Sequence, residues 1–521
     1  MSDPELLVGP TLAEFERLAM QRWPDREALV GGGRRVSYRE MSADANRFAR
    51  FLKGLGLKRG DAVAVLSANR PELVAAIQGA QILGLRCTPL HPMGSEDDQA
   101  FILEDAEIDA LIVDVENHSA RGRALMGRVS LKHVVTLGAG DYGVDALSGM
   151  APLDGADLPI EARPEDICVI NYTGGTTGRP KGVVHRHRSR VHMLTNELAY
   201  WEWPQEVRFL IATPMSHAAG SMLDATLVKG GTFHFHASFD VEAFLETIQR
   251  EKITATFLVP TMLYVLLDHP RLKDYDLSSL EMLIYGAAPM SPTRLKQALE
   301  VFGPIISQLY GQSEVPQTIT YMSKSDHDLS RPERLESCGL PIPTNQVRLI
   351  RPDGQEAQQG EPGEICVRGP IVMEGYWKRP EETEKAFAGG WLHTGDVARR
   401  DADGYLYIVD RTKDMIISGG FNVFPREVED VLADHPAVAM AAVVGAPDEK
   451  WGETVKAFVT LKAGASVSEA ELIAFVRERK GVVYAPKMVE MVDALPLTAL
   501  GKLDKKALRD RIWAGRERQV G

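Results

Sequence analysis

Short apolar runs alternate along the chain with segments whose apolar residues recur at helical spacing. Asp61–Leu66 is an almost unbroken apolar run of the kind that forms a buried strand, and Pro71–Leu83 is predicted as the helix that follows it. Asp240 can cap a second helix, because the apolar residues after it follow i, i+3, i+4, i+7 spacing. Further strands are predicted at 209–213, 254–258, 282–285 and 305–309. This alternation predicts an α/β fold.

The pattern changes near residue 411. Before it lies a β-rich stretch with Gly/Pro turns at 353–354, 361–363 and 389–390. After it comes a compact series of strand, glycine pair, helix, two strands and helix, which has the size of a small α+β domain. The sequence therefore predicts a large N-terminal domain of mixed α/β sheets plus a β-rich subdomain, residues 1–411, followed by a small α+β domain. A cleft between two such domains is a common place for a ligand.

Composition narrows the class of protein. The chain has 521 residues, of which 44% are hydrophobic and 25% charged, as in ordinary soluble globular proteins of several domains. A net charge of −13 argues against binding to nucleic acid. The longest near-continuous apolar run, Phe257–Leu267, is too short to span a membrane. The four cysteines form no CxxC pair and the N-terminus has no secretory pattern, so we expect a cytoplasmic protein.

A glycine- and threonine-rich loop is the most informative segment. A predicted strand enters it at Thr173, and a second strand leaves after Lys181. Glycines let successive backbone N–H groups converge on an anion, threonine hydroxyls add donors, and a lysine supplies positive charge. The loop is not a Walker motif, because Lys181 follows Pro180 and precedes Gly182. We predict that it binds phosphate through Thr173, Gly174, Gly175, Thr176, Thr177, Gly178 and Lys181.

The same loop resembles the signature of the adenylate-forming superfamily, which includes acyl-CoA synthetases, peptide-synthetase adenylation domains and firefly luciferase. The pattern aromatic-Thr-Ser/Gly-Gly-Ser/Thr-Thr-Gly-x-Pro-Lys-Gly is matched at every position from Tyr172 to Gly182. The remaining motifs of the superfamily occur in the expected order, so the resemblance covers essentially the whole chain. It implies that the protein is an enzyme that uses ATP and Mg²⁺.

The resemblance assigns roles in nucleotide binding. Residues 308–314 are similar to the motif Tyr-Gly-x-Thr-Glu, which implies that Tyr310 stacks on adenine and Glu314 holds Mg²⁺, a cation that prefers oxygen ligands. Asp396, in a Thr-Gly-Asp motif, is expected to accept hydrogen bonds from both ribose hydroxyls, and Arg411 to lie near ribose and phosphate. The other residues expected around the nucleotide are Gly286, Ala287, Ala288, Gly311, Gln312 and Ser313.

The acyl site is expected around Pro214–Gly220. His217 aligns with the gate residue of relatives, and Ala218 occupies the place of the acid that holds an ammonium group in amino-acid-activating relatives. An α-amino acid substrate is therefore disfavoured. The other residues expected to line the acyl site are Ala218, Gly220, Tyr285, Gly286, Gly311 and Val315. Small side chains at 218–220, 286–287 and 311 are expected to leave room for an apolar or aromatic acid.

The C-terminal part resembles the mobile domain of the superfamily. The resemblance places a hinge at 412–414, with Lys413 as its pivot, and a mobile domain at 415–521. Gly419, Gly420 and Phe421 are expected to line a tunnel for CoA. Lys502 matches the lysine that reaches the α-phosphate, and it is the predicted catalytic residue together with Lys181 and His217.

These motifs predict a two-step ligase that converts an acid, ATP and CoA into acyl-CoA, AMP and pyrophosphate through an acyl-adenylate. Its substrate is expected to be a fatty or other apolar acid, with an aryl acid as the alternative. A carrier-protein phosphopantetheine could replace CoA, although no carrier domain follows residue 521. A luciferase-like oxygenase and an inactive nucleotide-binding regulatory module remain open. Expected partners are small molecules, and a homodimer is left open.

Overall fold

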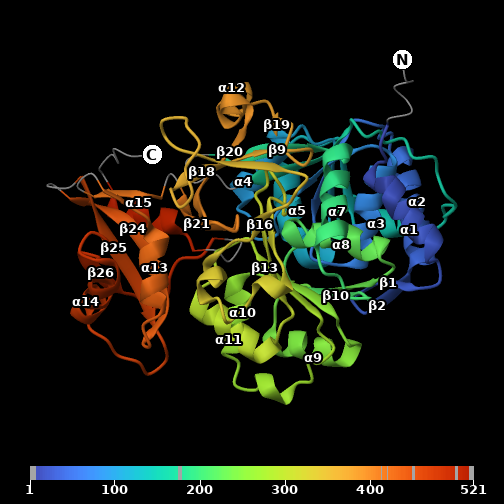
Figure 1. Cartoon of the computed structure of the whole chain (residues 1–521). Helices are drawn as coiled ribbons and strands as arrows, with labels where there is room; N and C mark the ends of the chain where they lie inside the picture. Colours follow the sequence, from blue (N-terminus) through green and yellow to red (C-terminus); the bar gives the residue numbers. More distant parts are fainter. Residues whose placement is uncertain are drawn as a thin grey trace.

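The computed structural model describes residues 8–173, 179–411, 414–418, 421–448, 452–498 and 503–514. For residues 410, 411, 417, 421, 422 and 452 only the backbone is described. Within these ranges the chain forms four sheets with helices packed between and around them (Figure 1). The predicted α/β class is confirmed.

The first sheet has eight strands in the order β19-β9-β8-β4-β3-β5-β6-β7. Its middle is parallel, whereas β8, β9 and β19 pair antiparallel. The predicted strand at 61–66 is β3, and the helix predicted after it is α3. The bounds are β3 Ala62–Leu66, β4 Arg86–Pro89, β5 Ala110–Val113, β6 His133–Thr136, β7 Val144–Asp145, β8 Ile167–Thr173, β9 Lys181–Arg186, β19 Gly375–Tyr376, α2 Tyr38–Gly54, α3 Pro71–Ile82, α4 Glu96–Asp105, α5 Val115–Arg128 and α6 Ala146–Met150.

The second sheet has nine strands in the order β16-β15-β14-β13-β12-β10-β11-β1-β2. All four strands predicted between residues 209 and 309 belong to it, as β10, β12, β13 and β14, and run parallel. The bounds are β1 Glu27–Gly31, β2 Arg34–Ser37, β10 Arg208–Ile211, β11 Thr232–Phe235, β12 Ala255–Leu258, β13 Met282–Gly286, β14 Ile306–Tyr310, β15 Thr320–Met322, β16 Leu340–Pro341, α1 Leu12–Arg22, α7 His187–Tyr200, α8 Ala218–Val228, α9 Val241–Glu251, α10 Pro260–Leu267 and α11 Pro292–Phe302.

Local sequence explains where several of these elements begin. The Asp240 side chain accepts the Ala243 N–H at 2.9 Å and so caps α9 as predicted. Pro260 ends the apolar run of β12 and occupies the first turn of α10, where its missing N–H costs nothing. No helix in the described ranges is long and apolar enough to cross a membrane.

The main core lies between the two large sheets. It joins strand residues of both sheets, such as Val63 and Phe209, with helices α2, α3 and α8. Helix α3 is buried along almost its whole length, and its sequence is mostly apolar, with Glu72, Gln78 and Gln81 as buried polar residues. The four cysteines, Cys87, Cys168, Cys338 and Cys366, are buried free thiols.

The third sheet is the predicted β-rich subdomain and is antiparallel, with the order β17-β18-β20-β21. Its strands end at Arg411, the residue before the predicted hinge. The bounds are β17 Gln346–Ile350, β18 Gly363–Arg368, β20 Leu392–Arg400, β21 Leu406–Arg411 and α12 Pro380–Ala386.

The fourth sheet is built entirely after residue 414, in the order β23-β22-β25-β24 with β26 beside β25. In Figure 1 it lies with α13–α15 at the left, beside α10 and α11. Thr293 of α11 hydrogen-bonds Asp434, and Arg399 of β20 pairs with Glu427 of α13. The bounds are β22 Ile416–Ser418, β23 Phe421–Val423, β24 Val438–Asp448, β25 Gly452–Leu461, β26 Met488–Met491, α13 Pro425–Ala433, α14 Glu469–Lys480 and α15 Lys505–Ile512. The domain limits 1–411, 412–414 and 415–521 stay a prediction.

Candidate active site

The predicted phosphate loop joins β8 to β9, and these strands pair antiparallel up to Thr173 and Lys181. The strand pairing therefore places Lys181 at the mouth of the loop. Its ammonium nitrogen lies 5.2 Å from the centre of the Tyr376 ring, in a cation–π contact. Of the predicted loop residues, Gly174, Gly175, Thr176, Thr177 and Gly178 lie outside the described residues.

Tyr376 also binds the predicted metal ligand. Its hydroxyl donates to Oε1 of Glu314 at 2.8 Å. Burial, followed by the nearby Glu314 carboxylate, raises the pKa of Tyr376 above its usual value, so the hydroxyl keeps its proton and remains a donor. Lys181 and Glu314 are thus brought together around one tyrosine. The sequence reasoning missed Tyr376, because it lies in the two-residue strand β19, whose pairing with β9 spans about 190 residues of chain.

Asp396, the residue predicted to bind ribose, lies beside Tyr310 and Gln312, which are predicted to lie around the nucleotide. Asp396 is only 4% exposed, and its Oδ2 accepts the Tyr310 hydroxyl at 2.7 Å and the Gln312 amide at 2.5 Å. Burial, with Asp396 close by, raises the pKa of Tyr310 well above its usual value. Asp396 lies opposite Arg411 in the β20–β21 ladder; the Arg411 side chain lies outside the described part of the structure.

A buried histidine supports the turn between Tyr310 and Glu314. His185 of β9 lies with Nε2 2.7 Å from the Ser313 carbonyl oxygen. Burial lowers the pKa of His185 to about 4, so the ring is neutral and its Nε2–H donates to that carbonyl. Gln312 and Val315 close the turn with reciprocal backbone hydrogen bonds. Val315, predicted to line the acyl site, is fully buried in the core beside β9 and β18.

The turn after β13 also carries predicted nucleotide and acyl residues. Tyr285 is buried and its hydroxyl donates to Gln308 at 2.9 Å. Ala287 has φ +67°, a left-handed conformation that costs a non-glycine residue roughly 1–3 kcal/mol. Such strain is typical of functional sites, and it marks the 286–288 turn as a shape that the surrounding fold imposes.

The predicted acyl gate, His217, directly precedes helix α8 and makes no side-chain capping hydrogen bond to it. The His217 ring packs edge-to-face against His91 with ring centres 4.7 Å apart, and its Nδ1 is 2.9 Å from the Ser216 hydroxyl. Asn69 holds the loop before it: its amide donates to the Thr213 and His236 carbonyls and its Oδ1 accepts the Met215 N–H. His91 and Asn69 were not predicted, since no local pattern connects them with residue 217.

Three of the glycines expected to leave room at this site lie against neighbouring backbone. A Cβ on Gly220 would lie 2.0 Å from the Met215 carbonyl oxygen, one on Gly286 2.7 Å from the Leu309 carbonyl oxygen, and one on Gly311 2.3 Å from the Gln317 nitrogen. These positions require glycine because neighbouring backbone approaches them closely. They give no information on the size of the acid.

Four predicted residues of the C-terminal part, Lys413, Gly419, Gly420 and Lys502, lie outside the described residues. The backbone of Phe421 begins β23, next to Ser418 in the β22–β23 ladder. The structure therefore does not test the predicted hinge, CoA tunnel and catalytic lysine.

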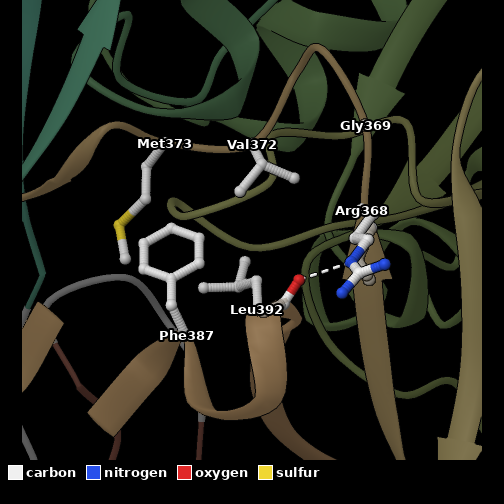
Figure 2. Close-up of a pocket in the computed structure, with 8 residues that line it drawn as sticks. Arg368, Gly369, Val372, Met373, Phe387 and Leu392 are labelled. Carbon is white, nitrogen blue, oxygen red and sulfur yellow. Dashed lines mark hydrogen bonds between the residues drawn. The ribbon is translucent and has the colours of Figure 1, made fainter. Parts of the chain in front are cut away.

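A small pocket of about 240 Å³ lies between β18 and the start of β20 (Figure 2). It borders the predicted metal ligand, because the Met373 N–H donates to the Glu314 carbonyl oxygen. Val372, Met373, Phe387 and Leu392 converge on it, and the Arg368 guanidinium already donates to the Gly390 carbonyl.

The chain matches two family models. Residues 15–377 match the AMP-binding enzyme model, and residues 427–502 match the model of the AMP-binding enzyme C-terminal domain. The chain belongs to the AMP-binding enzyme family. Because members share the adenylate-forming motifs quoted above, the predicted family, fold class and enzyme class are confirmed: this member is an AMP-forming acid–thiol ligase.

Relatives of this AMP-binding enzyme span nearly its whole length. A medium/long-chain-fatty-acid–CoA ligase of Mycobacterium tuberculosis is 48% identical over 522 residues, covering 96% of this chain and 90% of the relative. A feruloyl-CoA synthase of an Amycolatopsis species is 37% identical over 499 residues, covering 94% and 98%. The solved structure of an amide bond synthetase from Marinactinospora thermotolerans is 35% identical, with a TM-score of 0.89 and coverage of 96% and 99%.

Proposed function

We propose that the chain is a fatty-acid–CoA ligase that activates a medium- or long-chain acid with ATP. The observation that carries the proposal is the paired arrangement in which Tyr310 and Gln312 hold Asp396 while Tyr376 links Lys181 with Glu314. The first group is suited to a nucleoside and the second to a metal-bound phosphate chain. The fatty-acid class is supported by the relative at 48% identity.

The proposed first step joins the carboxylate to the α-phosphate of ATP and releases pyrophosphate. Both reactants are anions, so the site must lower their repulsion and hold them in line. Lys181 supplies positive charge at the phosphate loop, and Lys502 is proposed to reach the α-phosphate from the C-terminal part. Asp396, acceptor-only when ionised, is proposed to bind both ribose hydroxyls while Tyr310 and Gln312 keep its carboxylate in place.

Glu314 fits the proposed Mg²⁺. It is a half-buried carboxylate whose Oε1 is held by Tyr376, which orients the second oxygen for a hard cation. Bound there, Mg²⁺ would neutralise phosphate charge. The Tyr376 hydroxyl fixes the orientation of the carboxylate, and its ring makes the cation–π contact with the Lys181 ammonium.

In the proposed second step the CoA thiol attacks the acyl carbon of the mixed anhydride and AMP leaves. Gly419, Gly420 and Phe421 are proposed to line the thiol's path after the C-terminal domain turns about Lys413. His217 is proposed to line the carboxylate side of the acid. We retain the cytoplasm as the proposed compartment, since the four cysteines are free thiols. A homodimer stays an untested prediction.

The test measures pyrophosphate release and AMP formation with ATP and Mg²⁺, with and without CoA. The acid panel runs from acetate through fatty acids of increasing length to benzoate and hydroxycinnamates. We expect turnover that depends on both CoA and a medium- or long-chain fatty acid.

An aryl acid is the second candidate, favoured by the feruloyl-CoA synthase at 37% identity. Preference for hydroxycinnamates over every fatty acid would replace the first proposal with this one. A single release of pyrophosphate that stalls despite CoA would show that another nucleophile is the acceptor.

A further inference from the structure

Strand β20 departs from its pairing with β18 at the Thr-Gly-Asp motif. Glu364 lies opposite Val397 and Cys366 lies opposite His393, so two steps along β18 match four along β20. Residues 394–396 lie opposite the single residue Ile365 and form a bulge in which Gly395 has φ +72°. Bulges beside functional sites commonly re-aim a side chain. Here the re-aimed side chain is Asp396.

The Glu364 side chain makes hydrogen bonds to this bulge where the backbone pairing between β18 and β20 is interrupted. Its Oε1 accepts the Gly395 N–H at 2.8 Å, and its Oε2 lies 2.7 Å from Nδ1 of His393. The Nε2 of His393 lies 3.2 Å from the Ala388 carbonyl oxygen, so the ring is held at both nitrogens. One carboxylate therefore binds two successive parts of the bulge, a backbone donor and the side chain that precedes it.

Cys366 adds a third group of a type that zinc binds, and the three ligand atoms lie within 4.8 Å of one another. The geometry favours hydrogen bonding. The 2.7 Å between Glu364 and His393 is a hydrogen-bond distance, whereas ligands of a tetrahedral zinc are about 3.3 Å apart. Burial, followed by Glu364, raises the pKa of Cys366 to about 12, which keeps the thiol protonated beside the carboxylate.

We propose that Glu364 is a positioning residue for the nucleotide, because it holds the bulge that presents Asp396 to the ribose. The inference rests on the proposed contact between Asp396 and the ribose hydroxyls. Asp396 is fixed through its side chain by Tyr310 and Gln312, and Glu364 fixes its backbone through the residue before it. Without the Glu364 carboxylate, the Gly395 N–H loses this hydrogen-bond acceptor, and the bulge can adopt other conformations.

The experiment compares ATP with 2′,3′-dideoxy-ATP, which lacks the hydroxyls that Asp396 would bind. For Glu364→Ala we expect kcat/KM for ATP to fall roughly tenfold, as for loss of a charge-assisted hydrogen bond. The preference for ATP over the dideoxy analogue should fall by the same factor, with the KM for the acid changed less than about twofold. A purely structural defect would lower the values for both nucleotides equally.

Two further variants sharpen the comparison. Glu364→Gln should restore most of the preference, because the amide oxygen can still accept the Gly395 N–H. Glu356→Ala is the matched control: Glu356 is an exposed carboxylate that pairs with Arg348 of the same sheet. Glu356→Ala should leave kcat/KM unchanged for both nucleotides. Thermal melting shows whether each variant is folded.

The proposal is overturned if Glu364→Ala lowers kcat/KM for ATP and for the dideoxy analogue by the same factor. It is also overturned if Glu364→Gln prefers ATP no more strongly than the alanine variant does. Asp396→Ala separates this from failure of the proposed function. If Asp396→Ala abolishes the preference for ATP and Glu364→Ala does not, only the positioning role fails. If Asp396→Ala leaves the preference unchanged, the ribose contact itself is wrong.

Discussion

At the scale of single residues, Tyr376 connects the Lys181 ammonium with the Glu314 carboxylate, two charged groups that the proposed reaction requires close together. Its hydroxyl donates to Glu314 and its ring carries the Lys181 ammonium. Tyr376→Phe keeps the ring and removes the hydroxyl. We expect it to raise the Mg²⁺ concentration needed for half-maximal pyrophosphate release about five- to tenfold, since Glu314 loses the hydrogen bond that orients it.

The matched control for this variant is Tyr264→Phe, which removes a hydroxyl that accepts the Ser291 N–H near α10. A Tyr376→Phe enzyme with unchanged Mg²⁺ dependence would show that Glu314 is oriented by other means, or does not bind the metal.

Lys502 is the residue to which the sequence motifs assign the first half-reaction. Lys502→Ala should lower acid-dependent pyrophosphate release by at least about a hundredfold, because the developing charge at the α-phosphate loses its cation. Thioester formation from a supplied acyl-adenylate should remain largely intact. Measuring the two half-reactions separately checks this, and equal loss of both would contradict the assigned role.

At the scale of elements, the close approach of the loop at Met215 to helix α8 requires a glycine at position 220. Gly220→Ala would place a Cβ 2.0 Å from the Met215 carbonyl oxygen. We expect a loss of unfolding free energy of about 1–3 kcal/mol or more, as for overpacked cores, measured by chemical denaturation. The preference among acids should not move towards shorter chains, as it would if Gly220 lined an open pocket.

Gly54→Ala is a suitable control, because Gly54 is the last residue of α2 and no atom lies within 4 Å of the added Cβ. That variant should be neutral or slightly more stable, since alanine favours the helix. Comparable destabilisation by the two substitutions would mean that the cost at Gly220 is not steric.

The elements most visible in the sequence were those with continuous burial. Strands β3, β10, β12, β13 and β14 were predicted to within two residues, because parallel strands covered on both faces read as unbroken apolar runs. The motif residues of the site were likewise readable, since the phosphate loop and the Tyr310 and Asp396 turns are local. Tyr376, Glu364 and Asn69 were not, because each acts on a residue that the fold brings near from a distant part of the chain.

At the scale of the whole molecule, a buried carboxyl pair makes stability depend on pH. Glu16 of α1 and Asp224 of α8 are 4% and 8% exposed and share a hydrogen bond. Burial, followed by Asp224, raises the pKa of Glu16 well above its usual value, and burial raises that of Asp224. The folded protein therefore holds a proton that the unfolded chain, with carboxyl pKa values near about 4, has already released.

The sign follows from that proton. The unfolded state binds fewer protons, so the free energy of unfolding should fall as pH rises from about 4 towards the raised pKa, by up to about 1.4 kcal/mol per pH unit. Glu16→Gln should flatten this dependence and stabilise the protein more at pH ~8 than at pH ~6. Denaturation of both proteins across that range tests it, with the exposed Asp25→Asn as control; parallel curves would rule out the shared proton.

The four buried thiols give the molecule an internal reporter of its own opening. Burial raises the pKa of each cysteine to about 12, so a maleimide reacts only with chains in which the surrounding sheet has separated. Cys87 and Cys168 lie in strands of the eight-stranded sheet, Cys366 lies in β18 and Cys338 precedes β16; all four precede residue 411. Alkylation mapped by mass spectrometry would therefore follow the local opening of the sheets before residue 411, with no added cysteine, whereas the fourth sheet carries no thiol and would not be labelled.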